Sequence, residues 1–176
     1  YKNTSMDVFK KSFSEAINSS DIINGAGIWF EPNVYNASEK YMGPYWYKDG
    51  DNIVETWEYS NADYDYFNQE YYTNAAKMKE GTAEITDPYY DESSGTVMAT
   101  CSAPIYSDGK YLGCVTCDIQ LGTMVDIVSA IKVGDTGSAM LITSDGTYIY
   151  TDDSKKVENG ANIKEDDKDR KSTRLN

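Results

Sequence analysis

Two tyrosine pairs lie close to polar and acidic side chains in this sequence, and together they could bind a cation. Tyr71 and Tyr72 form one pair and Tyr89 and Tyr90 the other, within the stretch Asn68 to Gly95. The faces of phenol rings attract cations, and carboxylates accept charge-assisted hydrogen bonds from an ammonium group. The same pattern also arises by chance in a chain with 16 tyrosines, where the rings would be ordinary packing residues. The elements that carry these residues decide between the two interpretations.

The composition predicts a folded, acidic domain. The 16 Lys and Arg residues against 29 Asp and Glu give a formal net charge of -13, which repels phosphate backbones and argues against nucleic-acid binding. A chain of 176 residues with 40% hydrophobic residues can bury one core of ordinary size. There is no apolar run of the ~18 residues needed to cross a bilayer and no apolar core of a signal peptide. We therefore expect a soluble domain, with flanking membrane segments left open.

The three cysteines are an odd number, so at least one thiol stays free within the chain. Cys114 and Cys117 are three residues apart in an apparent strand and should point to opposite faces, which predicts no disulfide between them. A tight turn at residues 107–110 would place Cys101 opposite Thr116. Because the chain has no histidine and a single cysteine cluster, we expect neither a metal site nor a cofactor.

The hydrophobic periodicity predicts an α+β fold built on antiparallel strands. Short turn sequences, "DESSG" and "SDGK", join three consecutive strands and favour a meander. The predicted elements, in chain order, are a helix over residues 6–17, strands over 24–30 and 53–59, a helix over 65–79, strands over 82–90, 96–106 and 111–119, a helix over 121–131 and a hairpin over 138–153.

Five segments, taken in order, resemble the extracellular double-Cache sensor domains of bacterial chemoreceptors and sensor histidine kinases. They are "GAGIWFEPNVYN", "KYMGPYWYKDGDNI", "QEYYTNAAKMKEGTAEITDPYYDESSG", "VMATCSAPIYSDGKYLGCVTCDIQL" and "IKVGDTGSAMLITSDGTYIYTDD". The resemblance implies a long N-terminal helix, a PAS-like antiparallel sheet module and an incomplete second module at the C-terminus. The implied domains are the helix at 1–23, a membrane-distal ligand-binding module at 24–131, and the start of a membrane-proximal module with a polar tail at 132–176.

The resemblance also implies a ligand site in the distal module. Gln69 stands where the amino-acid-sensing members have an arginine, and Tyr71 stands where they have a tryptophan. The other five positions agree with those members. The implied ligand-binding residues are Tyr64, Gln69, Tyr71, Tyr72, Tyr89, Asp91 and Asp118.

The departure at Gln69 bears on the class of ligand. A glutamine cannot replace the charged, two-pronged grip of arginine on a ligand carboxylate. The pattern therefore favours an amine or amino-acid-like ammonium compound, with a neutral heterocycle such as a nucleobase as the alternative. Two carboxylates in one empty site, Asp91 and Asp118, would repel each other and raise the pKa of at least one. Taken without the resemblance, Asp91 would be a turn residue and Asp118 a helix N-cap.

The resemblance implies a small-molecule sensor that performs no chemistry, in the extracellular part of a cell-membrane receptor. Its partners would be the ligand and the receptor's own transmembrane helices and cytoplasmic signalling domain, with a homodimer through the N-terminal helix as a further option. Paired acids with aromatic platforms also suit a carbohydrate-binding module or a glycosidase, which stay open as alternatives.

Overall fold

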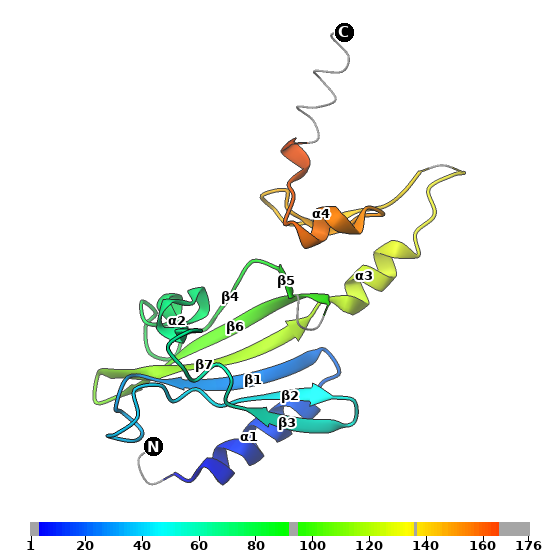
Figure 1. Ribbon diagram of the computed structural model, residues 1–176. Helices are drawn as coiled ribbons and strands as arrows, with labels where there is room; N and C mark the ends of the chain where they lie inside the picture. The colour runs from blue at the N-terminus through cyan, green and yellow to red at the C-terminus, as the bar shows by residue number, and fades with distance from the viewer. Residues whose placement is uncertain (1–3, 92–94, 136, 166–176) are drawn as a thin grey trace. The chain divides into compact units, whose positions relative to one another are not determined.

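The computed structural model describes residues 4–91, 95–135 and 137–165, and the chain forms two compact units (Figure 1). The first unit comprises the residues up to Thr86 together with Thr100–Ile119. The second comprises Asp87–Ala99 together with the residues from Gln120 onward. The module predicted at 24–131 thus supplies residues to both units.

An antiparallel sheet with helices gives the α+β fold that the sequence predicts. The strand order is β3-β2-β1-β7-β6-β4, with β5 paired to the start of β6. β6 and β7 are the two longest strands and form the predicted hairpin. The strands are β1 (Ile23–Phe30), β2 (Tyr45–Asp49), β3 (Asn52–Thr56), β4 (Glu84–Ile85), β5 (Tyr89–Asp91), β6 (Thr96–Ser107) and β7 (Lys110–Gln120).

Helix α1 (Met6–Asn18) covers one face of the sheet, as Figure 1 shows for strands β1 to β3. Its apolar residues recur at helical spacing, so they form one stripe that can be buried. Phe13 stacks on Trp46 with ring centroids 5.0 Å apart and an interplanar angle of 13°. Ile17 and Phe30 are fully buried in the same core. The predicted helix at residues 6–17 is confirmed, and its packing is the reason that it forms.

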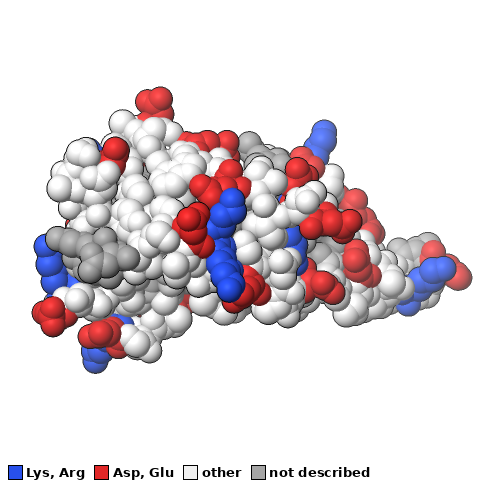
Figure 2. Space-filling view, turned by 90° about the horizontal axis from the view of Figure 1, so that it is seen from below, with Lys and Arg blue, Asp and Glu red and all other residues white. Residues whose placement is uncertain are grey.

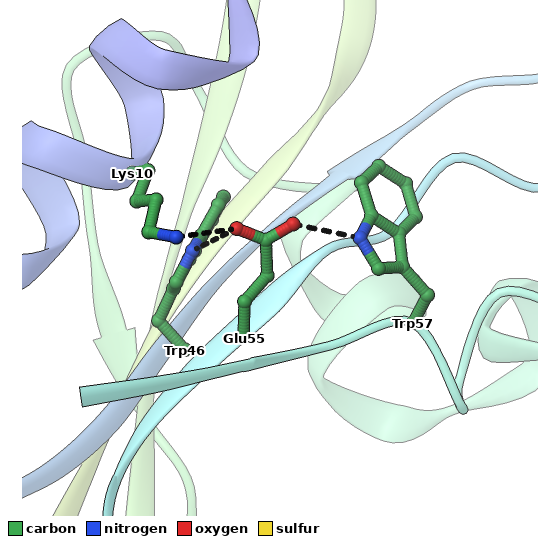
Figure 3. A network of polar contacts seen from close by, with 4 residues as sticks. All are labelled: Lys10, Trp46, Glu55 and Trp57. Atoms are coloured by element: carbon green, nitrogen blue, oxygen red, sulfur yellow. Dashed lines mark hydrogen bonds and ion pairs between the residues drawn. The ribbon is translucent and has the colours of Figure 1, made fainter. Parts of the chain in front are cut away.

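A carboxylate ties α1 to the edge of the sheet (Figure 3). Glu55 Oε2 lies 3.5 Å from Lys10 Nζ and accepts a hydrogen bond from Trp46 Nε1 at 3.1 Å. Its other oxygen accepts from Trp57 Nε1 at 2.8 Å. Partial burial opposes ionisation of Glu55, but the two indole donors and Lys10 outweigh it and lower the pKa of this carboxyl.

Glu55→Gln should reduce the dependence of the free energy of unfolding on pH under acidic conditions. A carboxyl whose pKa is lower in the folded than in the unfolded state stabilises the fold above its unfolded pKa, and this contribution is lost as the pH falls through the folded pKa. Urea unfolding between about pH 6 and pH 3, around the ordinary carboxyl pKa, should show a smaller loss of stability for the variant than for the parent. The control is Glu15→Gln, because Glu15 is exposed and lies 3.9 Å from Lys11. Equal slopes for the parent and Glu55→Gln would contradict this account.

The opposite face of the sheet carries shorter helical segments than the sequence predicts. The single helix expected over residues 65–79 is wrong: a 3-10 turn η1 (Tyr66–Asn68) is followed by α2 (Glu70–Ala75). Asp65 is in the left-handed region at φ 45°, and Gln69 between the two segments is extended. The fully buried Tyr66 explains the break, because its hydroxyl donates to Phe30 O at 2.6 Å and accepts from Met42 N at 3.0 Å. Tertiary bonds therefore override the local helix preference.

The second unit contains the remaining elements. The hairpin predicted at 138–153 is present with shorter strands, and Asp153 accepts a hydrogen bond from Lys155 N at the start of the last helix. The second half of the predicted polar tail, residues 166–176, lies outside the described residues. The further elements of this unit are α3 (Gly122–Ser129), β8 (Leu141–Ile142), β9 (Tyr148–Tyr150) and α4 (Ser154–Glu158).

Acidic side chains are scattered over the face shown in Figure 2, and lysines lie among them. This distribution agrees with the negative net charge of the chain. Among the described residues, none of the helices has the length and apolar character needed to cross a membrane.

Candidate ligand-binding site

Strand pairing gathers polar and aromatic side chains on the face of the sheet opposite α1, which we call the tyrosine face. The register of β1 and β7 pairs Gly25 with Asp118 and Trp29 with Cys114. Residues directly opposite each other in antiparallel strands point to the same side of the sheet. Asp118, Trp29 and Cys114 therefore share the tyrosine face, where Trp29 and Cys114 pack with the rings beside α2.

Asp118 is held by two hydroxyl donors, one on each carboxylate oxygen. Tyr45 donates to Oδ2 at 2.5 Å, and Thr100 donates to Oδ1 at 2.6 Å. Thr100 is buried and Asp118 is half-buried. Two charge-assisted bonds from different strands fix the plane of the carboxylate.

A missing side chain allows Tyr45 to reach Asp118. Gly25 lies in β1, between the strands that carry these two residues. A Cβ atom on Gly25 would lie 2.1 Å from Tyr45 Oη and 2.9 Å from the Trp46 carbonyl oxygen. Real atoms do not approach so closely, so only glycine leaves room for the phenol to cross β1.

Gly25→Ala should weaken ligand binding by roughly tenfold, because it pushes the Tyr45 hydroxyl off Asp118 and removes one charge-assisted hydrogen bond. Isothermal titration with the ligand found by the screen described below measures the change. Tyr45→Phe is the matched variant, since it removes the same hydrogen bond and adds no Cβ. If Gly25→Ala and Tyr45→Phe both bind as the parent does, the bond to Asp118 does not shape the site.

Aromatic rings cluster on the tyrosine face near this carboxylate. Trp29 and Tyr71 have ring centroids 5.1 Å apart, and Tyr59 and Tyr64 have centroids 4.8 Å apart. The Tyr45 ring joins the two pairs, at 6.3 Å from Trp29 and 5.7 Å from Tyr59. We call these five residues the aromatic wall. The four tyrosines are half-buried, so their rings are accessible in part.

Within the aromatic wall, Trp29 is fixed by a hydrogen bond and Tyr71 is neutral. Trp29 Nε1 donates to the buried Thr116 Oγ1 at 2.8 Å, which fixes the indole. Burial raises the pKa of Tyr71 far above its ordinary value, with smaller contributions from Tyr64, Cys114 and Asp118. The Tyr71 phenol therefore stays protonated at neutral pH, and Asp118 is close enough to influence it.

Three of the residues expected at the site, Tyr64, Tyr71 and Asp118, lie together on the tyrosine face. The Tyr71 and Tyr64 hydroxyls are 3.5 Å apart. Gln69 is adjacent, and its amide Nε2 donates to the Tyr64 carbonyl at 3.1 Å. Tyr72 is on the same face, but its hydroxyl donates to Glu31 Oε1 at 2.6 Å. Gln69 and Tyr72 thus have structural bonds of their own.

The other two expected site residues belong to the second unit. Tyr89 and Asp91 lie on β5, where they pair with Met98 and Thr96 of β6. Their contribution to the site stays a prediction.

The sequence analysis did not identify Tyr45 and Thr100 as partners of Asp118. Neither belongs to a recognisable motif. One sequence signal was available in β1. Gly25 and Gly27 alternate with larger residues, so two positions on one face of this strand have no side chain and leave room for side chains from the neighbouring strands.

The expected register of Cys101 is wrong. The Thr100 side chain bonds to Asp118, so these two residues share the tyrosine face. Cys101, the next residue in β6, points to the α1 face and does not face Thr116.

The family to which the chain belongs is one of sensor domains. Residues 9–126 match the family model described as Methyl-accepting chemotaxis protein-like, first PDC sensor domain. This match covers more than half of the chain, and the chain therefore belongs to that family.

Curated relatives are chemoreceptors. The chain is 29% identical over 96 residues to the methyl-accepting chemotaxis protein PctB of Pseudomonas aeruginosa, a match that covers 54% of this chain and 15% of that protein. It is 33% identical over 86 residues to McpB of Bacillus subtilis, covering 49% of this chain and 12% of that protein. The chain thus matches only a small part of the length of these receptors.

Solved structures share the fold. Methyl-accepting chemotaxis protein X has a TM-score of 0.69 at 25% identity, covering 98% of this chain and 68% of that one. The extracellular domain of a histidine kinase, mmHK1S-Z3, has a TM-score of 0.65 at 18% identity, covering 93% and 63%. The ligand-binding domain of Mlp24 with asparagine has a TM-score of 0.59 at 21% identity, covering 88% and 59%. The family model and the shared fold describe a sensor domain of the chemoreceptor type, which is not a catalytic family.

Proposed function

We propose that this domain binds a small organic ammonium compound, an amine or an amino-acid-like molecule, over Asp118. The observation that carries the proposal is the half-buried Asp118 carboxylate, fixed by Tyr45 and Thr100 beside the aromatic wall. A carboxylate attracts an ammonium group through its charge and accepts its N–H donors, while ring faces screen the charge of the guest from water. The asparagine bound by Mlp24 carries such a group, which supports the proposal.

Three lysines of the first unit have partners other than a ligand, which supports an amine over an α-amino acid. The only two arginines of the sequence, Arg170 and Arg174, lie outside the described residues. Lys10 lies beside Glu55, and Lys48 donates to the Ser20 carbonyl at 2.8 Å. The Lys40 ammonium lies over the ring of its neighbour Tyr41. These contacts direct three lysines to partners other than a ligand carboxylate, which supports recognition through the acidic end of the site.

A receptor built around this domain would pass the binding signal to its own transmembrane helices and cytoplasmic signalling domain. Homodimerisation through α1 remains part of this proposal. A neutral heterocycle is less favoured as a ligand. The Gln69 amide, which would hydrogen-bond to the polar edge of such a ring, already donates to the Tyr64 carbonyl.

A melting-temperature screen tests the proposal directly. The panel should contain primary and substituted amines, their parent amino acids, neutral nucleobases and matched carboxylic acids. A ligand at about 100 times its dissociation constant adds ~2.7 kcal/mol of stability, which gives a clear upward shift. We expect shifts with ammonium compounds. A shift produced only by acids or neutral rings would refute the proposal.

Gln69→Arg should weaken an amine and strengthen its parent α-amino acid. The added guanidinium repels an ammonium guest but can pair with a ligand carboxylate through two parallel hydrogen bonds. A change of roughly tenfold in each affinity follows from charges several ångströms apart near a protein surface. Gln69→Met is the control, because it removes the amide bond to Tyr64 without adding charge. If both ligands change in the same direction in Gln69→Arg, the charge argument is wrong.

A further inference from the structure

Cys101 and Cys117 lie opposite each other on neighbouring strands. β6 and β7 are adjacent in the sheet, and Leu121 N donates to Val97 O at 3.0 Å. The side-chain bond between Thr100 and Asp118 fits the same antiparallel register. In an antiparallel pair, each step forward on β6 corresponds to one step back on β7. Three steps from the pair Val97 and Leu121 lead to Thr100 and Asp118, and the fourth leads to Cys101 and Cys117. The register therefore makes the two cysteines a cross-strand pair.

Both thiols point to the same side of the sheet and are partly accessible. Cys117 pairs with Ala26 of β1, which belongs to the core beneath α1, and Cys101 pairs with Ile85 of β4. Both cysteines are half-buried. Cys114 is separated from them, because it is fully buried on the tyrosine face.

We propose that Cys101 and Cys117 form a redox-active dithiol that closes to a cross-strand disulfide in an oxidising environment. Directly opposed residues of antiparallel strands have Cα atoms roughly 4.5 to 5.5 Å apart. This range falls within the ~4.4 to 6.8 Å that a disulfide requires. An extracellular domain meets conditions in which disulfides form and persist. In the structure both cysteines are free.

Closure proceeds by thiol–disulfide exchange with a small-molecule disulfide such as oxidised glutathione. The thiolate of one cysteine attacks the glutathione disulfide, forms a mixed disulfide and releases one glutathione thiolate. The second cysteine thiolate attacks the protein sulfur of the mixed disulfide and releases the second glutathione thiolate. Two cysteine thiols are oxidised, one small-molecule disulfide is reduced to two thiols, and the two cysteine protons pass to the released thiolates.

The environments of Cys117 and Cys114 set the rate of closure and its selectivity. Burial, with Asp118 and Cys101 nearby, raises the pKa of Cys117, so closure should accelerate as the pH rises above neutrality. Burial also raises the pKa of Cys114 to about 12, so this thiol stays protonated and unreactive. The bond would form next to Thr100 and Asp118, whose side chains hold the polar pair on the opposite face.

The experiment equilibrates the folded, reduced chain with a series of glutathione mixtures of increasing oxidised fraction. Remaining thiols are then alkylated, and the intact protein and its proteolytic peptides are weighed by mass spectrometry. We expect a product that has lost two hydrogens, retains one alkylated thiol at Cys114, and contains a peptide cross-link between Cys101 and Cys117. Treatment with a thiol reductant should restore three alkylated cysteines.

Single cysteine-to-serine variants test which thiols form the disulfide. Cys114→Ser should still form the cross-link, whereas Cys101→Ser and Cys117→Ser should stop at a mixed disulfide that carries one glutathione. Three titratable thiols after equilibration with fully oxidised glutathione would overturn the proposal. A cross-link that includes Cys114 would overturn it as well, because it requires a different register.

Discussion

Asp118→Asn should weaken an ammonium ligand by roughly 10- to 150-fold, equivalent to about 1.5 to 3 kcal/mol, the value of a hydrogen bond to a charged group. The substitution keeps the volume of the side chain and one accepting oxygen, but it removes the charge that an ammonium guest meets. It also turns an NH₂ group toward Tyr45 or Thr100, both of which donate to this carboxylate. The hydroxyl that faces the NH₂ group can no longer donate there and has to accept from the amide instead, which replaces a charge-assisted hydrogen bond by a weaker neutral one.

The measurement is a calorimetric titration of the parent and Asp118→Asn with the amine found in the melting screen. Asp49→Asn is the matched control, because Asp49 is an exposed residue at the end of β2 and the charge change is identical. The control should bind as the parent does, apart from a small salt-dependent change. An unchanged affinity in Asp118→Asn would show that the cation binds elsewhere or that the ligand is not a cation.

Gly113→Ala should destabilise the domain by at least about 3 kcal/mol, in the range produced by strain and overpacking at a buried position. Gly113 pairs with Phe30 in the centre of the sheet, at φ +135°, a conformation that residues with a Cβ rarely adopt. An added Cβ would lie 2.0 Å from the Trp29 carbonyl oxygen and 2.8 Å from the Phe30 Cα atom. These are backbone atoms of the neighbouring strand, so no side-chain rotation can relieve the contact.

Urea unfolding followed by tryptophan fluorescence measures this effect, since Trp29, Trp46 and Trp57 all belong to the first unit. Gly122→Ala is the control, because a Cβ at the start of α3 would have no heavy atom within 4 Å. We expect the control to unfold at the urea concentration of the parent or slightly above it. If Gly113→Ala unfolds together with the control, the sheet at this point is looser than the contacts indicate.

The sequence was sufficient to predict the elements whose periodicity is strong. The stripe of α1 and the long strands β6 and β7 follow from local patterns of apolar residues, and the "SDGK" turn joins the two strands. The order of segments also pointed to the sensor family that the family model confirms. These features depend on side chains close together in the chain, so they can be recognised without knowing the fold.

The tertiary structure decided the features that depend on contacts between distant segments. The helix predicted over residues 65–79 is divided, because the Tyr66 hydroxyl bonds to backbone atoms of Phe30 and Met42. No local pattern contains that information.

The candidate site also combines features visible in the sequence with features that depend on the tertiary structure. Its acidic and aromatic residue types are visible in the sequence, but the donors to Asp118 come from residues 18 and 73 positions away along the chain. The register of β6 and β7 decides that Thr100 faces Asp118 and that Cys101 faces Cys117. A shift of one residue moves every side chain to the other face, and the hairpin turn alone did not predict the register found further along these strands. The sequence by itself therefore determined which residues could form a cation site, and only the packing of the strands decided which of them meet.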